Sequence, residues 1–183
     1  MKNKYSALLL LCLTISLTIQ AQIQSYNKAI GIRLTEGSFG SGASFDFKTY
    51  LNERSFFEPI CDKLGLEAFA GAYFNPFDDR FSTSITVLIE PHKEISTTGL
   101  SWYWGLGAST GFTTAPSLGG NISSSTFGPR GTGGIEYVLP NHPWAFNVGA
   151  LAGFDYVPNW GAPFNPLAMG TAAAIYLLDF SPR

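Results

Sequence analysis

The sequence predicts an all-β protein in which eight antiparallel strands close into a barrel after a cleaved N-terminal segment. Short runs that alternate apolar with small or polar residues recur at intervals of about 20 residues. Clusters of Gly, Pro, Asn and Asp separate these runs, and no stretch after residue 21 has the periodicity of a helix. The 183 residues leave room for one such domain.

The N-terminus predicts export. Lys2 and Lys4 form a positively charged start, residues 5–19 form an apolar run, and Ala21 is a small residue at a cleavage point. The run is shorter than the about 20 residues that a membrane-spanning helix needs. Residues 1–21 are therefore predicted to be a Sec-type signal peptide that is absent from the mature protein.

Residues 22–183 then form the barrel domain, which contains one cysteine. Cys12 lies in the removed segment, and Leu11 precedes it where lipid attachment to a cysteine needs a small residue. Cys61 is therefore the single thiol of the mature chain, so the sequence predicts no internal disulfide.

The composition favours a large apolar surface. Charged residues make up 13% of the chain, about half the roughly 25% of soluble domains, and aromatic residues make up 15%. Without Lys2 and Lys4 the mature chain holds nine basic and 13 acidic residues, a net charge of −4. Its basic residues form no cluster, which argues against a nucleic acid as partner.

The alternating runs give eight predicted strands, an even number that brings both ends of the domain to the same end of a barrel. The predicted strands span residues 28–36, 42–51, 64–74, 80–91, 99–113, 128–139, 144–157 and 168–180.

The run at 99–113 shows most clearly that the strands have two different faces. Trp102, Leu106 and Phe112 share one face, while Gly105 and Ser109 share the other. A soluble β-sandwich, which is the alternative, would turn the second face to water with Lys, Glu and Thr. Here Gly, Ser, Ala and Tyr dominate it, with isolated charges, which suits a narrow lumen filled by side chains. The bulky face is then predicted to meet lipid.

Aromatic residues are predicted to gather at two levels, as in the girdles that flank the apolar band of a membrane barrel. The periplasmic level holds Trp102, Trp104, Tyr137, Trp144, Phe146 and Phe180. The outer level holds Phe74, Phe77, Phe81, Phe112, Phe154, Tyr156 and Trp160.

Four stretches carry a resemblance to a known family: LNERSFFE, GLSWYWGLGASTGF, GGIEYVLPNHPWAFNVGALAGFDY and AAAIYLLDF. They resemble small outer-membrane β-barrel proteins of the OmpA/OmpX type, in the porin-like form that has a barrel and no periplasmic domain. The resemblance implies a place in the outer membrane of a Gram-negative bacterium, among outer-membrane lipid and lipopolysaccharide, after insertion by the barrel assembly machinery. Such barrels often end in an aromatic residue, whereas here Phe180 is followed by Ser181-Pro182-Arg183.

Eight charged residues are predicted to face the lumen. A charge in a narrow lumen must be paired or hydrated, so we interpret the set as a structural polar network that holds the barrel closed. Arg33 and Asp46 lie on neighbouring strands and are expected to pair, whereas Arg130 and Glu136 share a face at different depths. The alternative is a narrow ion path with an acidic bias. The set comprises Arg33, Asp46, Lys48, Glu67, Glu90, Arg130, Glu136 and Asp155.

The sequence predicts no enzyme, cofactor or metal site. His92 and His142 both fall in predicted periplasmic turns, where no strand packing holds a base against a nucleophile. Two scattered histidines and one cysteine also cannot form a zinc site.

Loops at the outer end are the predicted places of contact with a partner. The predicted loop 114–127 is uncharged and rich in Ser and Gly, and the predicted loop 158–167 carries Trp160 and Phe164. These two aromatic side chains are candidates for contact with an unknown extracellular partner, and the outer girdle is the alternative place for them.

The sequence therefore predicts an integral outer-membrane barrel with a filled lumen and a structural or surface-contact role in the cell envelope. Three alternatives remain open at this point: a narrow channel for small solutes or ions, an adhesin that acts through its loops, and a soluble periplasmic barrel that carries a lipid.

Overall fold

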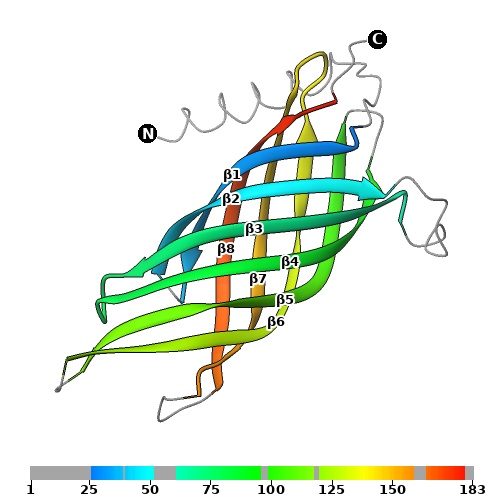
Figure 1. Cartoon of the computed structure of the whole chain (residues 1–183). Coiled ribbons are helices and arrows are strands. Elements are labelled where there is room, and N and C mark those ends of the chain that lie inside the picture. Colours follow the sequence, from blue (N-terminus) through cyan, green and yellow to red (C-terminus); the bar gives the residue numbers. More distant parts are fainter. Residues whose placement is uncertain are drawn as a thin grey trace, which may run out of the picture.

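In the computed structural model, eight antiparallel strands close into a barrel, which confirms the predicted fold (Figure 1). The structure describes residues 26–38, 40–51, 61–95, 99–117, 120–158 and 164–179. Each strand pairs with the next in sequence, and pairing of the first with the last closes the sheet. The strands are β1 (Lys28–Gly37), β2 (Gly40–Leu51), β3 (Lys63–Asn75), β4 (Arg80–Glu94), β5 (Leu100–Ser117), β6 (Gly120–Val138), β7 (Trp144–Tyr156) and β8 (Phe164–Leu177).

The barrel has two distinct ends. We call the base the end at which β1 begins and β8 ends, and the tip the opposite end, where β5 and β6 project furthest (Figure 1). No helix in the described part of the chain is long and apolar enough to cross a membrane. The predicted signal peptide, residues 1–21, lies outside the described residues.

The register of the ladder decides which side chains meet inside the barrel. Following paired residues once around the sheet from Lys28 returns to β1 at Ser38, so the closed sheet has a stagger of ten residues. The path runs through Lys28, Thr49, Leu66, Ile89, Leu106, Gly131, Ala152, Ala168 and Ser38. An eight-stranded barrel of this kind has an interior that side chains fill.

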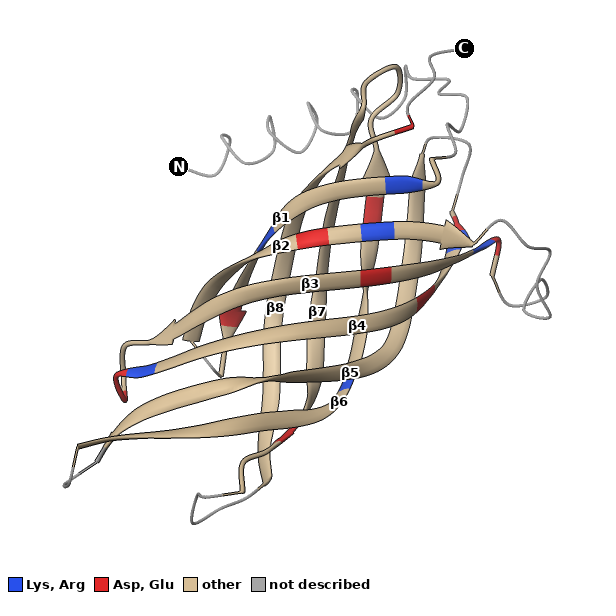
Figure 2. Ribbon diagram, in the orientation of Figure 1, with Lys and Arg blue, Asp and Glu red and all other residues tan. Residues whose placement is uncertain are grey.

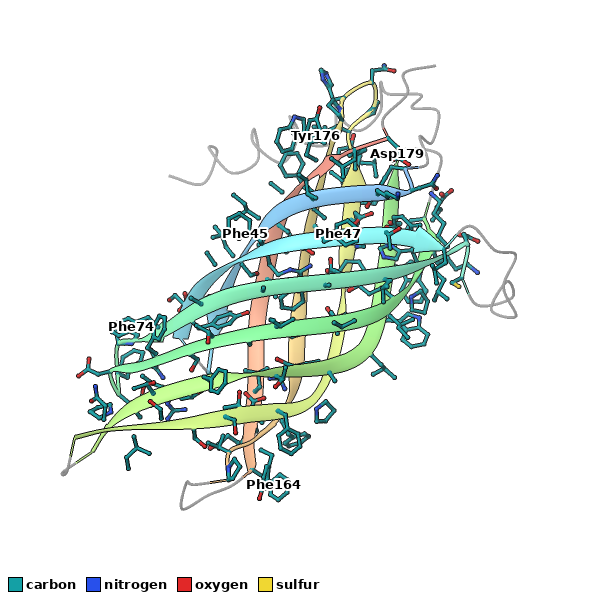
Figure 3. The ribbon with its side chains drawn as sticks, in the orientation of Figure 1. Phe45, Phe47, Phe74, Phe164, Tyr176 and Asp179 are labelled. Carbon is teal, nitrogen blue, oxygen red and sulfur yellow. The ribbon has the colours of Figure 1, made fainter. Side chains whose placement is uncertain are left out.

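The bulky face of each strand points out of the barrel, as the alternation predicts. Large apolar side chains stand on the outer face of every strand, and Phe45 reaches 78% exposure. Phe47, Phe74, Phe164 and Tyr176 point away from the barrel in the same way (Figure 3). The inward face holds small residues, hydroxyl groups and buried charges.

The two predicted outer loops are corrected by the structure. Residues 114–127 lie mostly in strands, because β5 continues to Ser117 and β6 begins at Gly120. β8 begins at Phe164, so the last residues of the predicted loop 158–167 are strand as well. Serine and glycine suggested a loop at 114–127, but the ladder between β5 and β6 continues, and the hydroxyls of Thr114 and Ser123 lie 2.9 Å apart across it.

Gly107 stands where the backbones of β4 and β5 approach closely, since a Cβ there would lie 1.9 Å from the carbonyl oxygen of Val87. We expect Gly107→Ala to lower the free energy of unfolding by about 1–3 kcal/mol, because the strands would have to shift. Gly133→Ala is the matched control, with its nearest atom at 3.6 Å. Urea unfolding in lipid vesicles, followed by tryptophan fluorescence, measures both variants, and equal losses would contradict the steric explanation.

Candidate functional site

Lys48 is the centre of a buried charged network. Figure 2 shows basic and acidic positions on neighbouring strands of the barrel wall. Its Nζ lies 2.9 Å from Glu136 Oε2, 3.1 Å from Glu90 Oε2 and 3.7 Å from Glu67 Oε1. All four side chains are at most 2% exposed. One ammonium group therefore links β2 to β3, β4 and β6, and β6 lies across the lumen from β2.

Arg33 extends the network toward β1. Its Nη2 lies 2.7 Å from Asp46 Oδ2 and 2.6 Å from Glu67 Oε1, and its Nε donates to Asp46 Oδ2 at 3.1 Å. The guanidinium carbon lies 4.6 Å from the centre of the Phe69 ring. Glu67 thus stands between the two cations, and the expected pair of Arg33 with Asp46 is present.

The structure places all eight predicted lumen residues inside the barrel but divides them into two groups. Six belong to the network around Lys48 and Arg33. Arg130 and Asp155 form a separate buried ion pair nearer the tip. Arg130 and Glu136, which share one face of β6, have different partners at different depths.

Tyrosines complete the network, and sequence reasoning did not single them out. The hydroxyls of Tyr26 and Tyr50 donate to Glu136 Oε1 at 2.8 and 2.9 Å. The ring of Tyr103 has its centre 5.1 Å from Lys48 Nζ. The alternation predicts that Tyr50 and Tyr103 face inward. Tyr26 precedes the first predicted strand, so the alternation does not predict its position.

The prediction that His92 lies in a periplasmic turn is wrong. β4 continues past Pro91 to Glu94, and His92 is buried with Nε2 3.5 Å from Glu90 Oε2. Proline normally ends a strand in the middle of a sheet, but here the ladder to β5 resumes at His92 after a gap. His142 lies exposed in the turn between β6 and β7, as predicted.

Apolar layers enclose the network at both ends. On the base side lie Tyr26, Ala29, Tyr50, Ala145, Ala173, Ile175 and Leu177. On the tip side lie Phe69, Tyr73, Leu88, Leu151, Leu167 and Met169. A cavity of about 20 Å³ beside Tyr26 and His92 is large enough for one water molecule. The arrangement is suited to holding strands together, because most of its charged groups form ion pairs with one another.

The metal-ligating residue types, Cys61 and Phe164 are the remaining candidates in the described part of the chain. No group of three His, Cys, Asp or Glu residues there is arranged to hold a metal ion. Cys61 is buried, and burial together with the nearby Asp62 raises the pKa of its thiol. Phe164 stands on the outer face, 68% exposed, and Trp160 lies outside the described residues.

The closed eight-stranded barrel with a filled lumen is the fold of small outer-membrane β-barrel proteins. The N-terminal β-barrel domain of Pseudomonas aeruginosa OprF superposes with a TM-score of 0.61 at 12% identity, covering 84% of this chain and 98% of that chain. Ail, the attachment invasion locus protein of Yersinia pestis, gives a TM-score of 0.51 at 14% identity, covering 83% and 95%. No family model and no curated protein sequence matches the chain. At these identities the likeness is one of fold.

Lys48→Met should destabilise the barrel by about 3–5 kcal/mol at neutral pH, because it leaves Glu67, Glu90 and Glu136 buried without their shared cation. Lys63→Met is the matched control. Its ion pair with Glu94 is 3.0 Å long but has side chains 30% and 28% exposed, so its loss should cost at most about 1 kcal/mol.

The deficit of Lys48→Met should shrink as the pH falls, because protonation removes the charge of the carboxyl groups that have lost their partner. Urea unfolding of both variants at neutral and acidic pH measures this. A deficit that stays constant with pH would show that Lys48 acts through packing and not through its charge.

Proposed function

We propose that this protein is an integral outer-membrane barrel, exported by its signal peptide, whose filled lumen gives it a structural role in the cell envelope. The belt of exposed apolar side chains carries this proposal. On β5 the belt runs from Trp102 to Phe112, which are 41% and 66% exposed. Ten residues of strand tilted by about 35–45° rise about 24–28 Å along the barrel axis, which matches the about 25 Å of an outer-membrane apolar band.

The outer surface changes its chemistry where that belt ends. Beyond Phe112 and Phe127, the outward positions of β5 and β6 carry Thr114, Ser123 and Ser125. At the other end, Trp144 and Tyr176 contact each other edge to face with their ring centres 5.2 Å apart. Aromatic residues at both limits of an apolar band support two membrane interfaces at these levels.

The lumen supports a structural role better than transport or catalysis. Lys48 joins strands that lie on opposite sides of the barrel, and apolar layers cover the network on its base and tip sides. An ion that entered would have to break ion pairs between fully buried groups. The same pairing occupies the carboxyl groups that a hydrolytic mechanism would need as acid and base.

Fractionation of cells that express the protein tests its location. We expect it in the outer membrane, with faster gel migration before heating than after, because a closed barrel resists dodecyl sulfate. Recovery in the soluble periplasmic fraction would overturn the membrane location. In planar bilayers we expect no conductance from the purified protein, and single-channel steps that change with Glu136→Gln would favour a channel.

Surface contact is a second candidate function, favoured by one edge of the projecting ribbon of β5 and β6. Between Gly120 and Thr126, β6 pairs with β5 alone among the described strands. No charge or proline protects that edge, whereas Pro116 lies on the β5 side. An edge without such protection accepts an extended peptide by strand pairing.

Ser125→Pro tests this second candidate. Odd-numbered residues of β6 turn their backbone toward β7 and not toward β5, so the proline removes a donor from the open edge and leaves the ribbon paired. On arrays of extended peptides, we expect the detergent-solubilised variant to bind at least about tenfold more weakly than the parent protein. Ser125→Ala keeps the N–H and should bind normally. Equal losses would assign binding to the side chain.

A further inference from the structure

A proline interrupts the ladder between β6 and β7 in the middle of the barrel wall. The two strands are paired at Phe127 and again at Arg130, but not at Gly128 or Pro129 between them. The register is the same on both sides of the gap, so no residue bulges out. Pro129 has no N–H, and the carbonyl of Phe154 opposite it has lost its backbone donor. This one lost hydrogen bond accounts for both missing pairs.

The side chain of Arg130 takes the place of the lost donor. Its Nη1 donates to Phe154 O at 3.0 Å and to Pro129 O at 3.1 Å, and its Nη2 pairs with the carboxylate of Asp155. Arg130 and Asp155 are 5% and 4% exposed. A guanidinium group from inside the lumen therefore supplies the donor that the backbone of β6 lacks at Pro129.

Gly128 and Gly153 leave the space that this arrangement needs. A Cβ at Gly128 would lie 1.6 Å from Phe154 O and 3.3 Å from Arg130 Nη1. A Cβ at Gly153 would lie 2.2 Å from Pro129 O. Both strands thus carry glycine where the carbonyl groups and the guanidinium meet.

The outside of the gap is apolar. A groove of about 770 Å³ crosses the outer face there, and its lining includes Ala108, Pro129, Phe154 and Phe164. The lining is mostly apolar, and the hydroxyl of Thr110 within it donates to Thr126 O and not to the carbonyl of Phe154. A backbone carbonyl without a donor beside an apolar phase is costly, so the donor has to come from the lumen side.

We propose that Arg130 and Asp155 form a latch that closes the seam between β6 and β7. Its release lets the barrel wall open locally toward the groove. A second proline gap lies between β4 and β5, at Glu90 and Pro91. In the uninterrupted ladders the wall is held by backbone hydrogen bonds, which have no separate released state. At this seam closure depends on one side chain, held in place by one carboxylate.

Hydrogen exchange of the protein in detergent micelles tests the latch. Arg130→Ala should raise the exchange rates of the β6 and β7 amides beside the gap, at Phe127, Phe154 and Tyr156, by about tenfold or more. Amides between β2 and β3 should change by less than about twofold. A uniform rise in all strands would overturn the proposal, because Arg130 would then act on global stability.

Restoring the backbone donor gives the sharper test. Pro129→Ala puts an N–H opposite Phe154 O, so in that background Arg130→Ala should raise exchange at the seam by less than about threefold. An equal rise in both backgrounds would show that the guanidinium does not replace the proline's donor, and would overturn the latch.

Two milder variants keep the test available if Arg130→Ala does not assemble. Asp155→Asn leaves the guanidinium without its anchor and Arg130→Lys leaves one small donor group, so each should give a smaller rise confined to the seam. Arg33→Lys is the matched control, because Arg33 lies in an uninterrupted ladder and its variant should not respond to Pro129→Ala. Unchanged exchange at the seam in both Asp155→Asn and Arg130→Lys would overturn the proposal.

Discussion

The closed hydrogen-bonded ladder is the constraint on which the rest of this structure depends. It fixes the register of eight strands at once, so the inward side chains cannot move to another face without breaking a ladder. Lys48 and Glu136 stand on strands that are not neighbours in the sheet, yet the closure brings their charged groups within 2.9 Å. Contacts across the lumen of this kind resist flattening of the barrel, which neighbouring strand pairs alone do not.

The position of the charges follows from the cost of burying them. Two cations share the network with four carboxyl groups, and Tyr26 and Tyr50 both donate to the carboxylate of Glu136. Such a cluster is tolerated when its members satisfy one another, and replacing it with apolar residues would fill the lumen equally well. The charges add selectivity for one strand register. If a strand slipped by two residues, its side chains would keep the same faces, but the charged groups would no longer meet their ion-pair partners.

The alternation in the sequence is enough to predict the faces of the strands, because in a closed barrel each strand residue points into the lumen or away from it according to its parity. The same parity placed the eight lumen charges inside. Parity does not determine which of them meet, since Arg130 pairs with Asp155 through the register between β6 and β7. Tyr26 lies before the first strand, and only the folded chain turns it back into the lumen.

The errors had a common cause, which was to treat residue types that usually break strands as strand ends. Pro91 favours a turn at His92, and serine and glycine favour a loop at 114–127. Both segments continue in the ladder. At Pro91 the local propensity is overridden because β3 still pairs with β4 there, so the missing donor on the β5 side does not end the strand. At 114–127 it is overridden by the continued pairing of β5 with β6.

The two places where the backbone of β6 lacks a partner on β7 differ in a way that follows the proposed membrane boundary. Within the apolar belt, the gap at Pro129 is filled by the guanidinium of Arg130, because hydrocarbon provides no donor. Beyond Phe127, where the outer face turns polar, the strand continues with no described partner on that edge. Water can satisfy the backbone there, as can the extended peptide of the second proposed function. In the proposed membrane placement, the point along β6 at which an unpaired edge becomes tolerable is also the point at which the surroundings change from lipid to water.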